Sequence, residues 1–247
     1  MTKILAIETA TEACSAAVLI DDNDVIERFE LAPREHTKLL LPMMDEVLEE
    51  AGITLSEVDA IAFSRGPGAF TGLRIAAGVA QGAALAVDIP VVPVSTLEAL
   101  ALLAVDLVHV AESGWQDDLV ITALDARMGE VYWGIFCYRD DEIISLMKES
   151  VSKPEDMMAK VLSTVNEMKD TKVYAIGSGW DAHQDILFEQ GKPEYLTHMK
   201  GALPKAENIA ELGFLAYLRG EAVPPEEAQP VYIRNKVAEK SKKYSSV

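Results

Sequence analysis

A pattern of three strands and a helix occurs twice in this chain, and this repeat restricts its fold more than any other feature. The first occurrence has strand-like segments at residues 3–9, 13–20 and 25–31, then a helical period over 36–51. The second has strand-like segments at 119–125, 130–138 and 143–147, then a helix at 154–168. The identities between the two copies are few, so the repeat rests on its pattern. It predicts an α/β protein with two similar lobes.

The remaining segments alternate between strand and helix. Strands are predicted at 58–64, 91–94 and 173–176, and helices at 71–87, 96–106 and 206–218. Such alternation is typical of largely parallel sheets covered by helices, with an antiparallel edge. The polar segment His109–Asp118 is the best linker, which predicts lobes at 1–108 and 118–247. Loops at the ends of the parallel strands would then line a cleft.

Charge and cysteine content exclude several classes of function. The 247 residues include 22 Lys and Arg against 40 Asp and Glu, a net charge of −18. A body this acidic repels nucleic acid and anionic membranes. Cys14 and Cys137 cannot form a disulfide framework, and the four histidines lack metal-binding spacing, so no metal site is predicted. The apolar stretch Ile75–Val87 is too short to span a bilayer and no signal peptide is evident, so we expect a cytoplasmic protein.

The glycine-rich segment 65–72 joins a strand to a helix. Glycines before a helix N-terminus favour an anion. The spacing of the Walker and dinucleotide motifs is absent, however. We therefore favour a plain tight loop with Thr71 as the helix N-cap over a phosphate site.

The helix predicted at 71–87 is apolar on all sides. One of its faces consists of small and apolar residues: Ile75, Gly78, Val79, Gly82 and Ala86. Glycine inside a helix costs about 1 kcal/mol relative to alanine, so close packing across Gly78 and Gly82 is expected in compensation. The neighbour is either another helix of this chain or a second subunit. Leu39 and Leu41 are apolar residues outside the core stripe of the preceding helix, which supports a second subunit. The two alternatives remain about equally favoured.

Glu8 and Asp125 end the first strand of each repeat. If both face one cleft, they could hold a divalent cation and phosphates. Solvated strand ends are the simpler interpretation, because no lysine or glycine motif lies at the right spacing. Arg127 is interpreted first as a turn residue and second as an anion contact. Other candidates at strand ends are Thr9, Thr11, Gly177 and Gly179.

The C-terminal tail, residues 234–247, is basic on an otherwise acidic chain. A solvated terminus is one interpretation of this asymmetry, and a minor contact to RNA or an acidic partner is the other.

Five segments along the whole chain resemble the TsaB family, also called YeaZ. They are ILAIETATEACS (4–15), PREHT (33–37), RGPGAFTGLR (65–74), DARMGEVY (125–132) and PVYIRN (230–235). The resemblance implies a two-lobed fold of the actin, sugar-kinase and Hsp70 type, which is ribonuclease H-like. It also implies a function in bacterial synthesis of threonylcarbamoyladenosine in tRNA.

In that family, TsaB pairs with the catalytic paralogue TsaD. With the ATPase TsaE it supports transfer of threonylcarbamoyl to the tRNA adenosine beside the anticodon. The resemblance implies no cofactor of its own, since ATP and metal belong to the partners. It further implies tRNA contact only through the complex, no membrane, and a homodimer when alone. The implied interface is helices 36–51 and 71–87, with His36, Leu39, Leu40, Met43, Arg74, Ile75, Gly78, Val79 and Gly82.

The resemblance also bears on catalysis. TsaD binds metal through a His-x-Glu-x-His segment, whose counterpart here is residues 94–100. Thr96 and Leu100 stand where the imidazoles would be, and leucine cannot bind metal. We therefore expect no catalytic residues and a non-catalytic scaffold. The alternatives are a standalone nucleotide-binding phosphotransferase or ATPase of the same fold, using Glu8 and Asp125, and a metallopeptidase.

Overall fold

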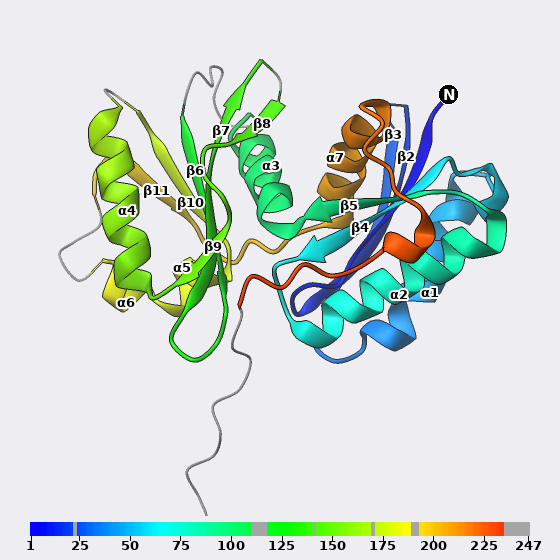
Figure 1. The fold of residues 1–247 in the computed structure, drawn as a ribbon, viewed down its shortest axis with the longest axis horizontal. Coiled ribbons are helices and arrows are strands. Elements are labelled where there is room, and N and C mark those ends of the chain that lie inside the picture. Colours follow the sequence, from blue (N-terminus) through cyan, green and yellow to red (C-terminus); the bar gives the residue numbers. More distant parts are fainter. Residues whose placement is uncertain (22–23, 110–117, 141, 169–170, 189–192, 235–247) are drawn as a thin grey trace, which may run out of the picture.

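The computed structural model describes residues 1–21, 24–109, 118–140, 142–168, 171–188 and 193–234. These residues form two sheets side by side, with helices on both faces of each (Figure 1). The predicted linker, apart from its first and last residues, and most of the basic tail lie outside the described residues.

The two sheets have the same strand order. The first is β3-β2-β1-β4-β5, built from β1 (Lys3–Glu8), β2 (Ala13–Ile20), β3 (Asp24–Leu31), β4 (Ala60–Gly66) and β5 (Val91–Ser95). The second is β8-β7-β6-β10-β11, built from β6 (Leu119–Asp125), β7 (Val131–Arg139), β8 (Glu142–Ser145), β10 (Val173–Ile176) and β11 (Leu196–Met199). The short strand β9 (Ser150–Ser152) also pairs with β7. In each sheet the first three strands in the chain pair antiparallel. The two later strands pair parallel, one with the first strand and the other with its neighbour. The predicted duplication and the two-lobed α/β architecture are confirmed.

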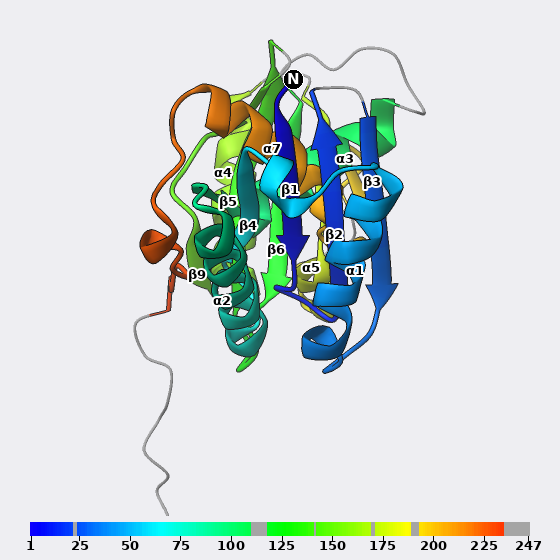
Figure 2. The ribbon, with the colours of Figure 1, turned by 90° about the vertical axis from the view of Figure 1, so that its right-hand side faces the viewer.

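Two helices cover the outer face of the first sheet. They are α1 (His36–Glu50) and α2 (Phe70–Val87), which lie side by side in Figure 2. Leu5, Ile7 and Phe63 project from the sheet into the core beneath them. On the second sheet the equivalent face is covered by α4 (Pro154–Glu167), α5 (Ser178–Ala182) and α6 (Gln184–Leu187), around Trp180.

The last helix of each half packs on the sheet of the other half. Helix α3 (Thr96–His109) follows β5 but shares a core with Val120 and Phe136 of the second sheet. Helix α7 (Ala206–Leu218) follows β11 but packs on the first sheet, where a Cβ on Gly213 would lie 2.5 Å from Ala62. The predicted division into 1–108 and 118–247 therefore needs correction, because each lobe takes a helix from beyond the linker.

Helix boundaries differ slightly from those expected. Helix α2 begins at Phe70 with Ala69 as its N-cap, so Thr71 does not cap it. Pro42 lies inside α1. Two 3₁₀ turns, Leu55–Glu57 and Pro225–Glu227, complete the described elements.

By length and composition alone, α2 is the one described helix that could cross a membrane. It has 18 residues and a mean hydropathy of 1.3. One such helix is weak evidence, because a helix packed in a protein core has the same composition. Here α2 packs on β4 and shares the first lobe's core.

Candidate functional site

A cavity of about 700 Å³ lies between the lobes. Its walls are the β1–β2 turn (residues 10–12), the glycine-rich loop (67–70), the β6–β7 hairpin (124–127), helix α5 and the C-terminal segment 231–234. Thr11, Asp125 and Arg127 line it, as predicted for cleft residues. The fold thus brings the carboxyl ends of β1 and β6 to one cleft.

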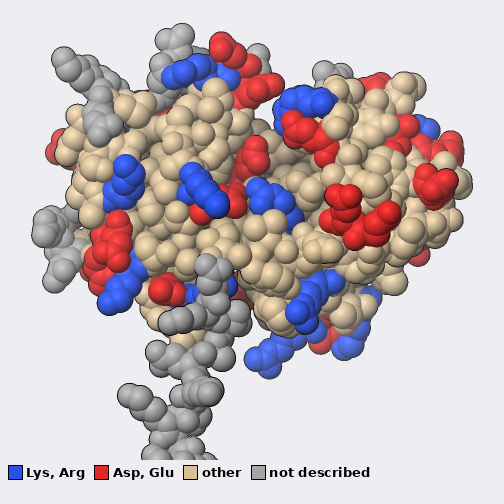
Figure 3. All heavy atoms as spheres, viewed as in Figure 1, with Lys and Arg blue, Asp and Glu red and all other residues tan. Residues whose placement is uncertain are grey.

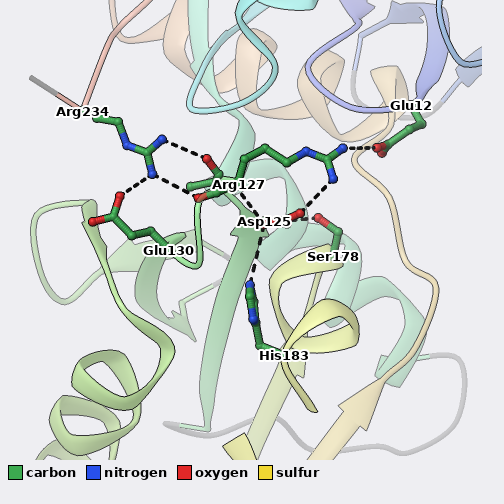
Figure 4. A network of polar contacts seen from close by, with 8 residues as sticks. Glu12, Asp125, Arg127, Glu130, Ser178, His183 and Arg234 are labelled. Atoms are coloured by element: carbon green, nitrogen blue, oxygen red, sulfur yellow. Dashed lines mark hydrogen bonds and ion pairs between the residues drawn. The ribbon is translucent and has the colours of Figure 1, made fainter. Parts of the chain in front are cut away.

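Asp125 is held by its own hairpin and by α5 (Figure 4). Its Oδ1 accepts a hydrogen bond from the backbone N–H of Arg127 at 2.9 Å, and its Oδ2 accepts one from the Arg127 guanidinium at 3.1 Å. Its backbone N–H donates to Ser178 at 3.2 Å, and Nε2 of His183 lies 3.7 Å from Oδ1. Both carboxylate oxygens of Asp125 therefore have partners within the second lobe. Arg127 supplies two of these hydrogen bonds within its own turn, as expected for the predicted turn residue.

Glu8 does not face the cavity. Its side chain is fully buried, and Oε1 accepts a hydrogen bond from the backbone N–H of Ala10. Burial raises the pKa of Glu8 to about 7, opposed by Ala10 and the neighbouring Ser64. The alternative of a cation held between Glu8 and Asp125 is therefore wrong, because only one of the two carboxylates reaches the cleft. The favoured interpretation, a solvated strand end, is also wrong for Glu8, because its side chain is buried.

Glycines of the 65–72 loop serve close packing. A Cβ on Gly72 would lie 1.9 Å from the carbonyl oxygen of Thr9, and one on Gly68 would lie 2.6 Å from that of Ala10. The Thr9 hydroxyl donates to the Gly72 carbonyl at 2.8 Å, so Thr9 is buried and does not line the cavity. The loop is a tight connection that packs on the β1–β2 turn, which is the interpretation that the sequence favours over a phosphate site.

Gly177 and Gly179 likewise lie behind the cavity wall. Cβ atoms there would approach the Ala123 backbone to 2.4 and 2.9 Å, respectively. They let α5 pack closely on β6, and only Ser178 between them lines the cavity.

The outward face of α2 carries the residues predicted for subunit contact. A Cβ on Gly78 or Gly82 would meet nothing within 4 Å among the described residues, so no helix of this part of the chain covers them. Ile75 and Val79 are half-buried beside them, and Arg74 is exposed. Leu85 of α2 is 58% exposed and Leu41 of α1 is 54% exposed. We call this surface, namely Leu39, Leu41, Arg74, Ile75, Gly78, Val79, Gly82 and Leu85, the α1–α2 face.

Three residues predicted for this interface are buried. Leu40 and Met43 belong to the core under α1. Nε2 of His36 lies 3.0 and 3.1 Å from the carbonyl oxygens of Thr11 and Ala13. The correction has a simple cause, because these three lie on the helical stripe that faces the sheet.

At the counterpart of the metal-binding segment, Thr96 and Leu100 are fully buried at the start of α3. Over the residues that the structure describes, no group of three or more His, Cys, Asp or Glu side chains could hold a metal ion.

Sequence reasoning missed three residues around the cleft. Tyr232 packs on Phe70, with ring centroids 5.6 Å apart, and Arg234 contacts the β6–β7 hairpin (Figure 4). Glu12 lies across the cleft from Arg127. Tyr232 and Arg234 both belong to the family-like segment PVYIRN (230–235), which could have indicated them. From the sequence alone, Arg234 counts only as one of the basic charges of the tail.

Comparison with known proteins identifies the family. A family model described as "TsaD: tRNA N6-adenosine threonylcarbamoyltransferase" matches residues 25–242. The chain is 40% identical over 241 residues to the tRNA threonylcarbamoyladenosine biosynthesis protein TsaB of Escherichia coli (strain K12), covering 96% of each protein. The chain belongs to the TsaB family. A more distant member, from Bacillus subtilis (strain 168), is 28% identical over 211 residues, covering 85% of this chain and 86% of that protein.

A solved TsaB-family structure has the same fold. YeaZ from Pseudomonas aeruginosa matches with a TM-score of 0.80 and 39% identity, over 94% of this chain and 100% of that one. The expected family and fold are therefore both confirmed. The curated relatives from Escherichia coli and Bacillus subtilis are both named tRNA threonylcarbamoyladenosine biosynthesis proteins.

Proposed function

We propose that this chain is a non-catalytic subunit required for threonylcarbamoyl transfer to the tRNA adenosine beside the anticodon. It acts in the cytoplasm as a scaffold and activator of a TsaD-type catalytic paralogue, together with a TsaE-type ATPase. ATP and metal belong to those partners, and tRNA binds through the complex.

The observation that carries this proposal is the α1–α2 face. An apolar helix face with two exposed glycines costs helix stability and leaves hydrophobic surface in water. A second helix pair could approach closely over Gly78 and Gly82 and bury Ile75 and Val79. The TsaD-type paralogue is the proposed occupant, and a second copy of this chain takes its place when the partner is absent.

The charge distribution supports indirect contact with tRNA. The chain has a net charge of −18, and Figure 3 shows acidic side chains on both lobes of one face, interspersed with basic ones. On that face, the described residues offer no continuous basic track for a phosphate backbone. The partner subunits would supply that track.

Mass spectrometry of tRNA nucleosides tests the proposal directly. Depletion of this protein should remove threonylcarbamoyladenosine, and the wild-type chain should restore it. Gly78→Arg should fail to restore it and should not co-purify with the paralogue, while melting no lower than the monomeric wild type. Ser163→Arg, on the exposed surface of α4, is the matched control and should behave as wild type. Full restoration by Gly78→Arg would contradict the proposal.

A standalone nucleotide-dependent phosphotransferase is the second candidate, favoured only by the cavity between the lobes. Burial of Glu8 and the internal partners of Asp125 leave no free carboxylate pair for a magnesium ion. Calorimetry of the isolated chain with ATP and Mg²⁺ separates the two functions. Binding that is lost in Asp125→Ala would favour the phosphotransferase.

A further inference from the structure

Within the residues that the structure describes, the chain crosses between the two lobes at three places. It crosses from β5 into α3 at residues 95–96, and from β11 into α7 at residues 199–206. The third crossing follows α7. Val223, after this helix, still pairs with Val91 on the first lobe. Residues 229–234 then run from the first lobe across to the second (Figure 1). We call residues 229–234 the strap.

The strap is fastened to the first lobe by backbone and ring contacts. The N–H of Val231 donates to the carbonyl oxygen of Arg65 at 2.7 Å. The Tyr232 ring packs on Phe70, and its hydroxyl accepts a hydrogen bond from Nε of Arg74 at 3.2 Å. The Arg74 guanidinium lies 3.9 Å from the centre of the Phe70 ring. Tyr232 therefore seats the strap on the first turn of α2.

Arg234 fastens the strap to the second lobe. Its guanidinium donates to the carbonyl oxygen of Ala126 at 3.1 Å and to the carboxylate of Glu130. The side chain is only 14% exposed. These acceptors are on the β6–β7 hairpin, where Arg127, Met128 and Gly129 all have positive φ. A planar fork of donors is suited to hold carbonyl and carboxylate groups of one turn together.

The strap also divides the space between the lobes. Val231, Tyr232 and Ile233 line the cavity of about 700 Å³. The same three residues line a second cavity of about 460 Å³, whose other walls include Arg65, Glu98 and Glu149. The strap is thus a shared wall between two cavities and lies within the cleft itself.

We propose that the strap is a conformational lock that fixes the relative position of the lobes. The other two crossings adjoin α3 and α7, which lie between the sheets and contact each other through Asn208 and Asp106. The lobes can hinge about these helices only if the strap releases one anchor. Release of Arg234 would remove the strap's hold on the second lobe and leave, between the facing surfaces of the lobes, the exposed Arg127–Glu12 pair and the contacts of Glu149 with Arg65 and Ser95. This inference does not depend on the proposed function.

Pulsed electron paramagnetic resonance on the full chain tests the lock. Spin labels at Glu49→Cys on α1 and Lys160→Cys on α4 report the separation of the lobes, since both positions are exposed and the native Cys14 and Cys137 are buried. A parent without added cysteines measures background labelling. The wild-type strap should give one narrow distance distribution. Arg234→Ala should broaden it and shift it to longer distances.

Two further variants keep the test decisive. Tyr232→Ala releases the other anchor and should give the same shift, even if Arg234→Ala does not fold. Arg28→Ala removes an arginine that pairs with Glu46 and Glu50 within the first lobe, and should leave the distribution unchanged. Distributions for folded Arg234→Ala or Tyr232→Ala that superimpose on the wild type would overturn the proposal. So would an equal shift in Arg28→Ala.

Discussion

The guanidinium of Arg127 donates a hydrogen bond to the Glu12 carboxylate across the cleft, at 3.2 Å. Glu12 follows the first strand of one repeat and Arg127 follows the first strand of the other. Equivalent ends of the duplicated fold therefore meet through a charged pair. Arg127 is 76% exposed and Glu12 47% exposed, so water screens this contact strongly.

Their different exposure predicts that Arg127 of the β6–β7 hairpin and Arg234 of the strap contribute differently to stability. Arg127→Ala should lower the free energy of unfolding by less than about 1 kcal/mol, as for other exposed ion pairs. Arg234→Ala removes hydrogen bonds from a largely buried guanidinium and should cost about 2 kcal/mol. Urea unfolding measures both values. Equal losses would contradict the burial difference.

Two glycines of α2 should respond to alanine in opposite ways. Gly72→Ala places a Cβ 1.9 Å from a backbone oxygen, so the helix must move, at a cost of about 3 kcal/mol or more. Gly78→Ala meets open space and should raise stability by about 0.5–1 kcal/mol through helix propensity. Thermal melts of the isolated chain, dilute enough to be monomeric, compare them. A loss of stability in monomeric Gly78→Ala would contradict the open space around Gly78 within the chain.

Periodicity and turn residues were enough to predict the duplicated sheets, because buried strands and amphipathic helices carry their own signal. Strands β6 and β10 and helix α7 were predicted with the bounds observed. The exchange of α3 and α7 was missed for a physical reason. An apolar helix face has the same sequence pattern whichever sheet it covers, so local pattern does not name its partner.

Two adjacent leucines of α1 lie on different sides of the helix, Leu40 in the core and Leu41 on the α1–α2 face. Leu40 is 1% exposed, and Leu40→Ala should cost about 2–5 kcal/mol by leaving a cavity. Leu41 is 54% exposed, and Leu41→Ala should change stability by less than about 0.5 kcal/mol. Chemical denaturation gives the stability of each variant. Co-purification with the paralogue should be weakened by Leu41→Ala, and an unweakened complex would exclude Leu41 from the contact.

The candidate site was harder to predict than the fold. Glu8 and Asp125 occupy equivalent strand ends, yet one is buried and the other reaches the cavity. The difference arises because Glu8 has the strand parity of Ile4 and Ala6, on the face of the first sheet that α7 covers. Asp125 instead has the parity of Ile121 and Ala123, on the face of the second sheet under α5. The packing of α7 on the first sheet joins segments distant in sequence, which strand-end position alone does not reveal.

Glu8 should make stability depend on pH. Its pKa is raised by burial from 4.5 to about 7, so between these values the folded chain keeps a proton that the unfolded chain releases. Stability therefore falls as pH rises through this interval, and above pH 7 Glu8 adds no further slope. The full loss from Glu8 is about 3 kcal/mol, taken from the shift in pKa.

Glu8→Gln isolates this contribution, because glutamine keeps the shape of the side chain and does not ionise. The variant should match the parent near pH 4.5 and exceed it in unfolding free energy by up to about 3 kcal/mol at pH 8. Burial also raises the pKa of Glu27 and Glu211 to about 7, but both carboxyls remain in parent and variant and cancel in the difference. Urea titrations at the two pH values give that difference. A difference that is the same at pH 4.5 and pH 8 would mean that Glu8 ionises in the folded chain as it does in water.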